Sequence, residues 1–236
     1  MHAFLRAVCV SLLAFGVASC SAGKQFNPPQ PGQLQLGATT PNDLIAIAGE
    51  PYARSAATLS SSQQSQPPRS VFDSAKAPGS YERLTYAYVD TSGQQLIGRF
   101  AGVVPRRALI ANFFNGKLGS YLEVSSFKDD TTDFDTSKIS SLQRDKSTRS
   151  DVIALFGPPN GAGTYPFISR PDGMAIVYAF SETNVTTREI RTKTLAIYLD
   201  ANDVVRDFES NSAVNPLATA PATTTTTVPI FIPRGK

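Results

Sequence analysis

The side chains that carry most enzyme chemistry are scarce in this sequence and lie at its start. The one histidine, His2, and the two cysteines, Cys9 and Cys20, all fall within the first 20 residues. Serine–histidine and cysteine–histidine nucleophiles, like Cys/His zinc sites, need these groups in the folded part of a chain. We therefore expect a protein that is not an enzyme and that has no bound metal, no cofactor and no small-molecule substrate.

Two other patterns look like chemical sites but lack the context that such sites need. Ser125 and Lys128 have the Ser-x-x-Lys spacing of penicillin-binding enzymes, yet we expect a strand to end at Ser125, where that motif needs the start of a helix. The basic residues are scattered and the formal charge is only +3, so we expect no nucleic-acid partner. Four acidic residues lack the spacing of an EF-hand, and we interpret them as part of a solvated linker: Asp129, Asp130, Asp133 and Asp135.

The first 20 residues have the pattern of an export signal. An apolar run follows Arg6 and is about 12 residues long, well short of the roughly 20 that a membrane-spanning helix needs. We therefore predict a signal peptide over residues 1–19. Its end, Val17-Ala18-Ser19-Cys20, resembles the bacterial lipobox. The resemblance implies that Cys20 begins the mature chain and carries diacylglycerol and further acyl chains such as palmitate.

Lipid on Cys20 would anchor the protein, because two or more acyl chains hold a protein stably on a membrane where one is marginal. Ser21 follows the cysteine, and by resemblance to lipoproteins of Gram-negative bacteria this implies the outer membrane, with the protein facing the periplasm. Cys20 would be the only cysteine of the mature chain, so no disulfide could form within it. The alternative is a cytosolic N-terminal helix with an incidental cysteine.

A motif of twelve residues occurs twice in the chain, at a spacing of 108 residues. Residues 40–51 and 148–159 share Thr, Asp, Ile, Ala, Gly and Pro at matching positions. Each copy is typical of a short helix, because the Thr is an N-cap, the Asp completes a capping box, the Gly ends the helix and the Pro prevents its continuation. The motif residues are Thr40, Asp43, Gly49, Pro51, Thr148, Asp151, Gly157 and Pro159.

Each motif is followed by segments with the composition of β-strands. Residues 84–88 and 176–180 are apolar and aromatic, and we interpret each as the first strand of a unit. In the first unit, residues 109–113 and 118–124 flank Asn115-Gly116, a strong hairpin signal, and the second unit has a comparable hairpin near its end. The pattern predicts an α+β fold of two tandem units, each with short helices packed on a three-stranded antiparallel sheet.

Composition sets the boundaries of these units. Residues 56–78 are rich in Ser, Gln and Pro, and we expect an exposed loop there. The predicted organisation is a signal peptide at 1–19, a tether at 20–35, a first unit at 36–127, a linker at 128–141, a second unit at 142–210 and a Thr/Pro-rich tail at 211–236.

The repeated motif resembles the SmpA/OmlA (BamE) family of small outer-membrane lipoproteins. The likeness lies in residues 36–40 with 49–51, and more closely in residues 146–159. It extends over roughly residues 36–127 and 142–210. The resemblance implies a protein-interaction module in β-barrel assembly at the outer membrane. Two such units in tandem also resemble the β-lactamase inhibitor proteins, which bind an enzyme through a concave sheet surface.

These observations predict an adaptor anchored in the outer membrane that acts in outer-membrane protein assembly or envelope integrity. Its expected partners are the membrane, through the lipid on Cys20, and other outer-membrane or periplasmic proteins. One alternative is a structural lipoprotein subunit of an envelope-spanning secretion or pilus machine, and another is an inhibitor of a periplasmic hydrolase. The first alternative would use an apolar stretch of the tail that could add a strand to another protein's sheet: Val228, Ile230, Phe231 and Ile232.

Overall fold

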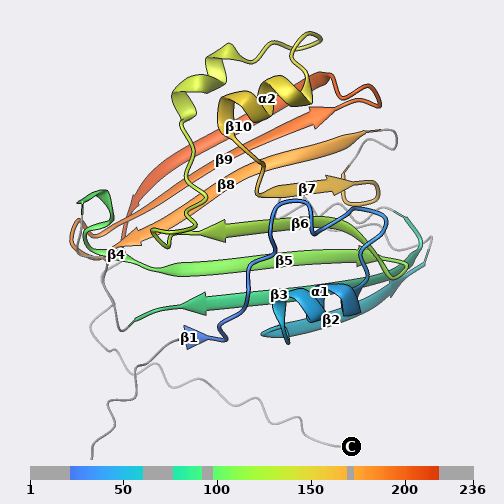
Figure 1. Cartoon of the computed structure of the whole chain (residues 1–236), viewed down its shortest axis with the longest axis horizontal. Helices are drawn as coiled ribbons and strands as arrows, with labels where there is room; N and C mark the ends of the chain where they lie inside the picture. The colour runs from blue at the N-terminus through green and yellow to red at the C-terminus, as the bar shows by residue number, and fades with distance from the viewer. Residues whose placement is uncertain (1–21, 61–76, 92–97, 169–172, 218–236) are drawn as a thin grey trace, which may run out of the picture.

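The computed structural model describes residues 22–60, 77–91, 98–168 and 173–217. Two α-helices and short 3₁₀ turns accompany the strands in these ranges (Figure 1). The elements are β1 Ala22–Gly23, α1 Pro41–Ala48, β2 Ala53–Leu59, β3 Gly79–Val89, η1 Gly98–Phe100, β4 Val103–Val104, β5 Arg106–Phe114, β6 Lys117–Ser125, η2 Thr136–Ser141, α2 Arg149–Phe156, β7 Gly161–Thr164, β8 Met174–Asn184, β9 Glu189–Leu199 and β10 Val205–Pro216.

The strands of the described residues form one antiparallel sheet of ten strands. Their order is β1-β3-β5-β6-β7-β8-β9-β10, with β2 also beside β3 and β4 beside β8 (Figure 1). The predicted fold class is therefore wrong, because the two halves do not form separate units on three-stranded sheets. The halves merge where β6 pairs with β7, with Tyr121 opposite Ala162.

The first unit has two strands more than the sequence indicated, β2 and the two-residue β4, and the second unit has one more, β7. Residues 84–88 and 176–180 lie inside β3 and β8, and another strand, β2 or β7, precedes each of them. β2 occupies part of the expected loop at 56–78, of which residues 61–76 lie outside the described ranges. Six of the seven β2 residues are exposed, and β7 reads Gly-Ala-Gly-Thr. Neither strand shows the apolar alternation by which strands are recognised.

The two copies of the repeated motif form the same capped helix. Thr40 before α1 and Thr148 before α2 have nearly identical extended backbones, with φ of −98° and −100°. In each copy the threonine N–H donates to the carboxylate of the aspartate three residues later, at 2.8 Å. Gly49 and Gly157 follow the helices with φ of +85° and +81°, a region that favours glycine, so both helices end there.

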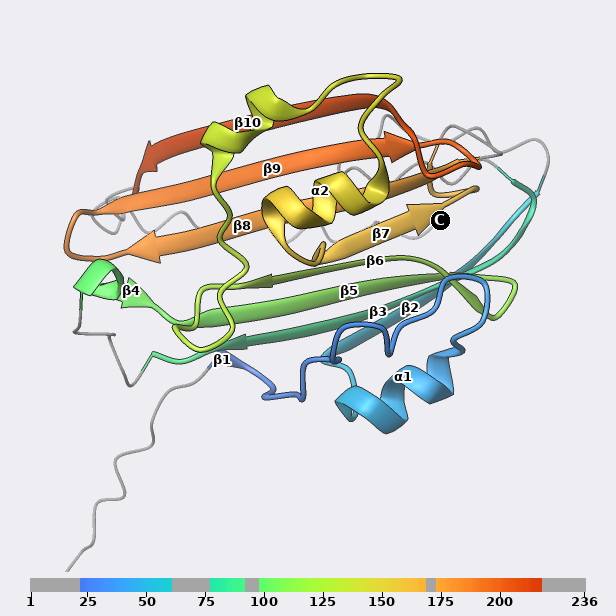
Figure 2. The same ribbon diagram turned by 45° about the horizontal axis from the view of Figure 1, so that its top comes forward.

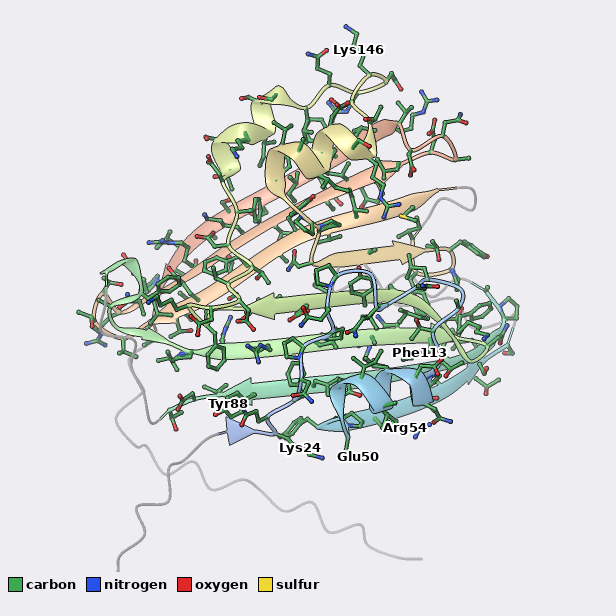
Figure 3. The ribbon with its side chains drawn as sticks, in the orientation of Figure 1. Lys24, Glu50, Arg54, Tyr88, Phe113 and Lys146 are labelled. Carbon is green, nitrogen blue, oxygen red and sulfur yellow. The ribbon has the colours of Figure 1, made fainter. Side chains whose placement is uncertain are left out.

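Both helices cover the same face of the sheet, which we call the helix face (Figure 2). Leu44 of α1 is fully buried in one cluster, which also includes Phe113 beneath the helix (Figure 3). Val152 of α2 is fully buried in a second cluster. Tyr121 of β6 packs against both clusters, so the core continues from one half to the other. On the opposite face, Phe167 packs in a third, smaller cluster.

Two segments expected to be extended or solvated lie against the sheet instead. In the predicted tether, β1 pairs with β3 and Phe26 is buried in the α1 cluster. In the predicted linker, Phe134 is buried against Tyr178, with ring centroids 5.9 Å apart. β10 pairs with β9 as far as Pro216, beyond the expected end of the second unit at residue 210.

Candidate functional site

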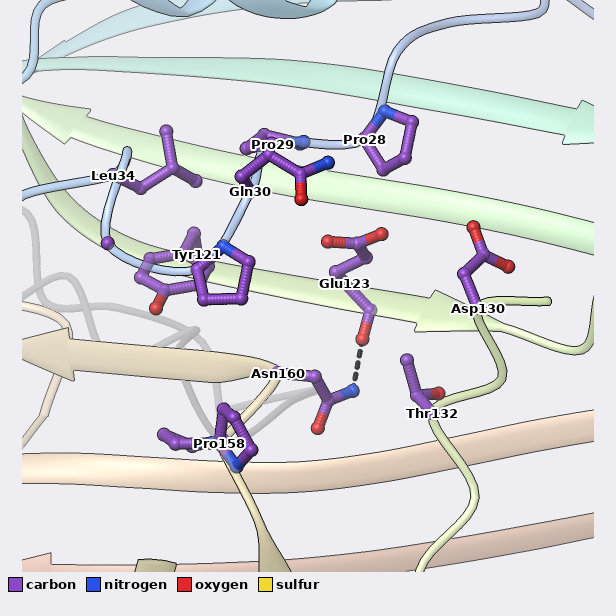
Figure 4. A pocket seen from close by; sticks show the side chains of 13 residues that line it. Pro28, Pro29, Gln30, Leu34, Tyr121, Glu123, Asp130, Thr132, Pro158 and Asn160 are labelled. Atoms are coloured by element: carbon purple, nitrogen blue, oxygen red, sulfur yellow. Dashed lines mark hydrogen bonds between the residues drawn. The ribbon is translucent and has the colours of Figure 1, made fainter.

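A cavity of about 230 Å³ opens on the helix face where the two halves of the sheet meet. We call it the seam pocket. Four segments line it: residues 28–34 of the N-terminal segment, residues 121–123 of β6, residues 130–132 and residues 158–160 after α2 (Figure 4). These segments are far apart in the sequence, so the pocket exists only because the halves share one sheet.

The pocket lies where the sheet splits, because β7 pairs with only three residues of β6, Ser120 to Leu122. Beyond that point the side chains of Asn160 and Thr132 bridge β6 to β8. Asn160 Oδ1 accepts the Ala179 N–H at 2.9 Å, while Asn160 Nδ2 donates to the carbonyls of Ala179, at 2.8 Å, and Glu123 (Figure 4). Thr132 Oγ1 donates to Ala179 O at 2.8 Å. The two side chains thus take the place of a missing stretch of strand.

Glu123 is the most perturbed acid of the site. Burial raises the pKa of its carboxyl from the ordinary 4.5 to about 7, with Asp130 adding to the rise and Arg107 opposing it. Among the described residues, no group donates a hydrogen bond to this carboxylate. A carboxyl that titrates near neutrality is uncommon and marks a candidate site when it lies in a cavity.

The neighbouring Asp130 is held firmly by two partners. Ser125 Oγ donates to Asp130 Oδ1 at 2.6 Å, and Arg107 forms an ion pair with the other oxygen. The Arg107 guanidinium lies 4.9 Å from the centre of the Phe127 ring, a cation–π contact that fixes its position. Phe127 in turn stacks on Tyr88, with the ring planes 6° apart. One end of the guanidinium is thus bound to Asp130, while its buried Nε has no hydrogen-bond partner among the described residues and Glu123 receives no hydrogen bond from it.

The remaining wall of the pocket is largely apolar. The proline rings of this wall offer no backbone N–H to a ligand. Tyr121 adds an aromatic ring, and burial raises the pKa of its phenol, so the hydroxyl stays neutral at ordinary pH. Gln30 at the rim is exposed. The lining prolines are Pro28, Pro29, Pro31, Pro158 and Pro159.

The structure separates the residues that the sequence singled out. Cys20 lies outside the described ranges, as do the tail residues Val228, Ile230, Phe231 and Ile232. Among the eight motif residues, only Pro159 lines the seam pocket, while the others cap or end α1 and α2. The carbonyl of Gly157 accepts the Tyr178 hydroxyl at 2.7 Å, which ties the end of α2 to the sheet. The motif is thus a structural device near the pocket.

The acidic linker is the clearest difference from the sequence interpretation. Asp130 pairs with Arg107, and Asp133 accepts a hydrogen bond from Lys193 Nζ at 2.7 Å with only 14% of its side chain exposed. These two carboxylates are structural ties between the linker and the sheet. In the described ranges, no group of three or more Asp, Glu, His or Cys side chains is arranged to hold a metal ion.

Sequence reasoning missed Glu123 and Asn160. A signal for Glu123 exists, because strand alternation places it on the same face as the core residue Tyr121, where a charged residue is unusual. For Asn160 no such signal exists, because its role depends on β6 and β8 diverging. Ser125 is fully buried at the end of β6 and donates its hydroxyl to Asp130, so it does not serve as an exposed nucleophile.

The wider comparisons do not place the chain in a family. Scanning protein-family models finds no match, and neither the curated proteins nor the solved structures contain a match. None of the helices within the described ranges has the length and apolar composition that crossing a bilayer requires. The seam pocket and the sequence motifs are the features of this chain that bear on its function.

Proposed function

We propose that this protein is a lipid-anchored envelope adaptor that binds another protein at the seam pocket. The observation that carries the proposal is the size and chemistry of the pocket. Its 230 Å³ is below the roughly 300–1,000 Å³ of typical small-molecule and cofactor sites, yet it surrounds a carboxylate with apolar walls. A cavity of this size suits a single side chain of a partner protein, the kind of anchor on which interfaces depend.

The N-terminal segment supports a membrane-proximal role. Residue 28, the first that lines the pocket, follows the proposed lipidation site Cys20 by eight positions. An extended chain spans at most about 3.5 Å per residue, so the pocket would stay within about 28 Å of the anchor. Confinement at a membrane raises the effective concentration of partners held in the same membrane. The resemblance to the SmpA/OmlA family favours the outer membrane and β-barrel assembly as the setting.

A structural subunit of a secretion or pilus machine is the second candidate, and one observation favours it. Within the described residues, β10 pairs with β9 alone, so one long edge of the sheet is open. Residues 210–215 on this edge carry no charge, although natural edges are commonly protected by charged residues. A neighbouring subunit could add a strand there.

Chemical crosslinking in intact envelopes, followed by purification of the lipidated protein and mass spectrometry, separates these candidates. Recovery of barrel-assembly components supports the adaptor. Recovery of secretion-ring or pilus proteins instead favours the structural subunit, and recovery of a periplasmic hydrolase favours an inhibitor. If the protein crosslinks to no other protein in envelopes while lipidated and folded, the proposal is wrong.

A further inference from the structure

We propose that the seam pocket receives a basic side chain of the partner, best an arginine, with Glu123 as its counter-ion. This inference rests on the proposed function, because it names the chemistry of the group that the partner inserts. It goes further in assigning a single residue of this chain to the recognition.

The first observation in support is that, within the described residues, the backbone of Glu123 is hydrogen-bonded while its carboxylate is not. Its backbone N–H donates to Asn160 O at 2.8 Å, and its carbonyl accepts from the Asn160 side chain. Its carboxylate, by contrast, lies in the cavity and accepts no hydrogen bond from any described residue (Figure 4). The backbone is therefore fixed while the charged end is free, which is the arrangement that a binding site needs.

The second support is the balance of charge. Two carboxylates, Glu123 and Asp130, face one cation, Arg107, so one negative charge is in excess when Glu123 is ionised. Arg107 is already bound to Asp130 and stacked on Phe127. An incoming cation would restore neutrality beside a partly buried carboxylate, where charge-assisted hydrogen bonds are stronger than in open water.

The third support is the shape and chemistry of the walls. A guanidinium is planar and weakly hydrated, so it stacks on aromatic rings, and the ring of Tyr121 is available in the lining. The alkyl stem of an arginine would pack on the proline rings of residues 28–31 and 158–159. Anions are disfavoured because the excess charge is negative and the Arg107 charge is already balanced by Asp130.

The test measures binding of small probes to the full mature chain in detergent micelles. The probes are N-acetyl-arginine N-methylamide and its neutral analogue, N-acetyl-citrulline N-methylamide, which has nearly the same shape. We expect the arginine probe to bind at least tenfold more tightly at pH 8 by calorimetry. We also expect it to lower the pKa of Glu123 by at least one pH unit, as followed by NMR of a ¹³C-labelled carboxyl. Equal affinity for the two probes, or an unchanged Glu123 titration, overturns the inference.

Two variants assign the effect to Glu123. Glu123→Gln keeps the shape of the side chain and removes its charge, so the preference for arginine over citrulline should vanish. Glu50→Gln, a change at an exposed carboxyl after α1, should leave that preference intact. Thermal unfolding of each variant shows that it is folded when tested. The probes need no partner, so the two proposals can fail separately. Arginine binding without any envelope crosslink would refute only the proposed function. Envelope crosslinks without a preference for arginine would refute only this inference.

Discussion

Replacing Glu123 by glutamine should stabilise the protein at alkaline pH and leave it unchanged at acidic pH. The pKa of Glu123 is raised from 4.5 to about 7 by burial, so the folded protein holds the proton more tightly than the unfolded chain. The stability that the Glu123 carboxyl contributes in its protonated form is therefore complete below pH 4.5, and it is lost as the pH rises to 7. At about 1.4 kcal/mol per pH unit, the loss amounts to about 3 kcal/mol.

Urea unfolding followed by circular dichroism, at half-unit steps from pH 4.5 to 8, measures this effect. The difference in unfolding free energy between Glu123→Gln and the natural protein should be near zero at pH 4.5 and should grow to about 3 kcal/mol at pH 8. Other acids also titrate in this range, but they are common to both proteins and cancel in the difference. Glu50→Gln is the matched control, because it makes the same replacement at an exposed carboxyl. A pH-independent difference for Glu123→Gln would refute the assignment of a partly buried carboxylate without a hydrogen-bond donor.

Three further changes test the helix cap, the bridge across the split sheet and the anchor. Thr148→Ala should lower the free energy of unfolding by about 1 kcal/mol, measured by urea unfolding, because the hydroxyl that caps α2 is lost. Thr148→Ser keeps a hydroxyl and should retain the stability of the natural protein. Equal stability of all three proteins would contradict the capping role. Asn160→Ala should cost about 2 kcal/mol in the same assay, because the Ala179 N–H and the Glu123 carbonyl lose their Asn160 partner, and an unchanged stability would show that the bridge contributes nothing. Cys20→Ala should move the protein from the membrane fraction to the soluble fraction, and retention in the membrane would exclude lipid as the anchor.

Local features of this fold could be predicted from the sequence because they depend on neighbouring residues. Thr40 and Thr148 begin their helices by bonding to groups three residues away, so the signal is contained in the motif. The turn at Asn115-Gly116 is similarly local, since both residues adopt positive φ, 49° and 76°, as the hairpin requires.

The merging of the two halves could not be predicted in this way. The pairing of β6 with β7 is a contact between strand edges, and periodicity reports only which face of a strand is buried. β7 is short and rich in glycine, so its side chains give almost no alternating pattern by which a strand could be predicted. Phe26 likewise gives no sign in the sequence that it packs under the first half, because an isolated aromatic residue among prolines looks like part of a tether.

The seam pocket results from this same long-range pairing, so the sequence motifs could not predict it. Glu123 is the one acidic residue of β6, but only the meeting of β6 with residues 28–34 and 158–160 makes it a lining residue. The proposed binding of a cation thus depends on a glutamate, a common residue type, that lies in an unusual environment.

Site-specific photocrosslinking in intact envelopes tests the central claim most directly. A photoreactive residue would replace Gln30 at the rim of the pocket, and a second protein would carry it at Asn211 on the exposed part of β10 as the matched control. We predict a discrete protein adduct from position 30, reduced by Glu123→Gln, and none of the same size from position 211. An adduct from position 211 alone, or none from position 30 in folded and lipidated protein, would contradict that claim.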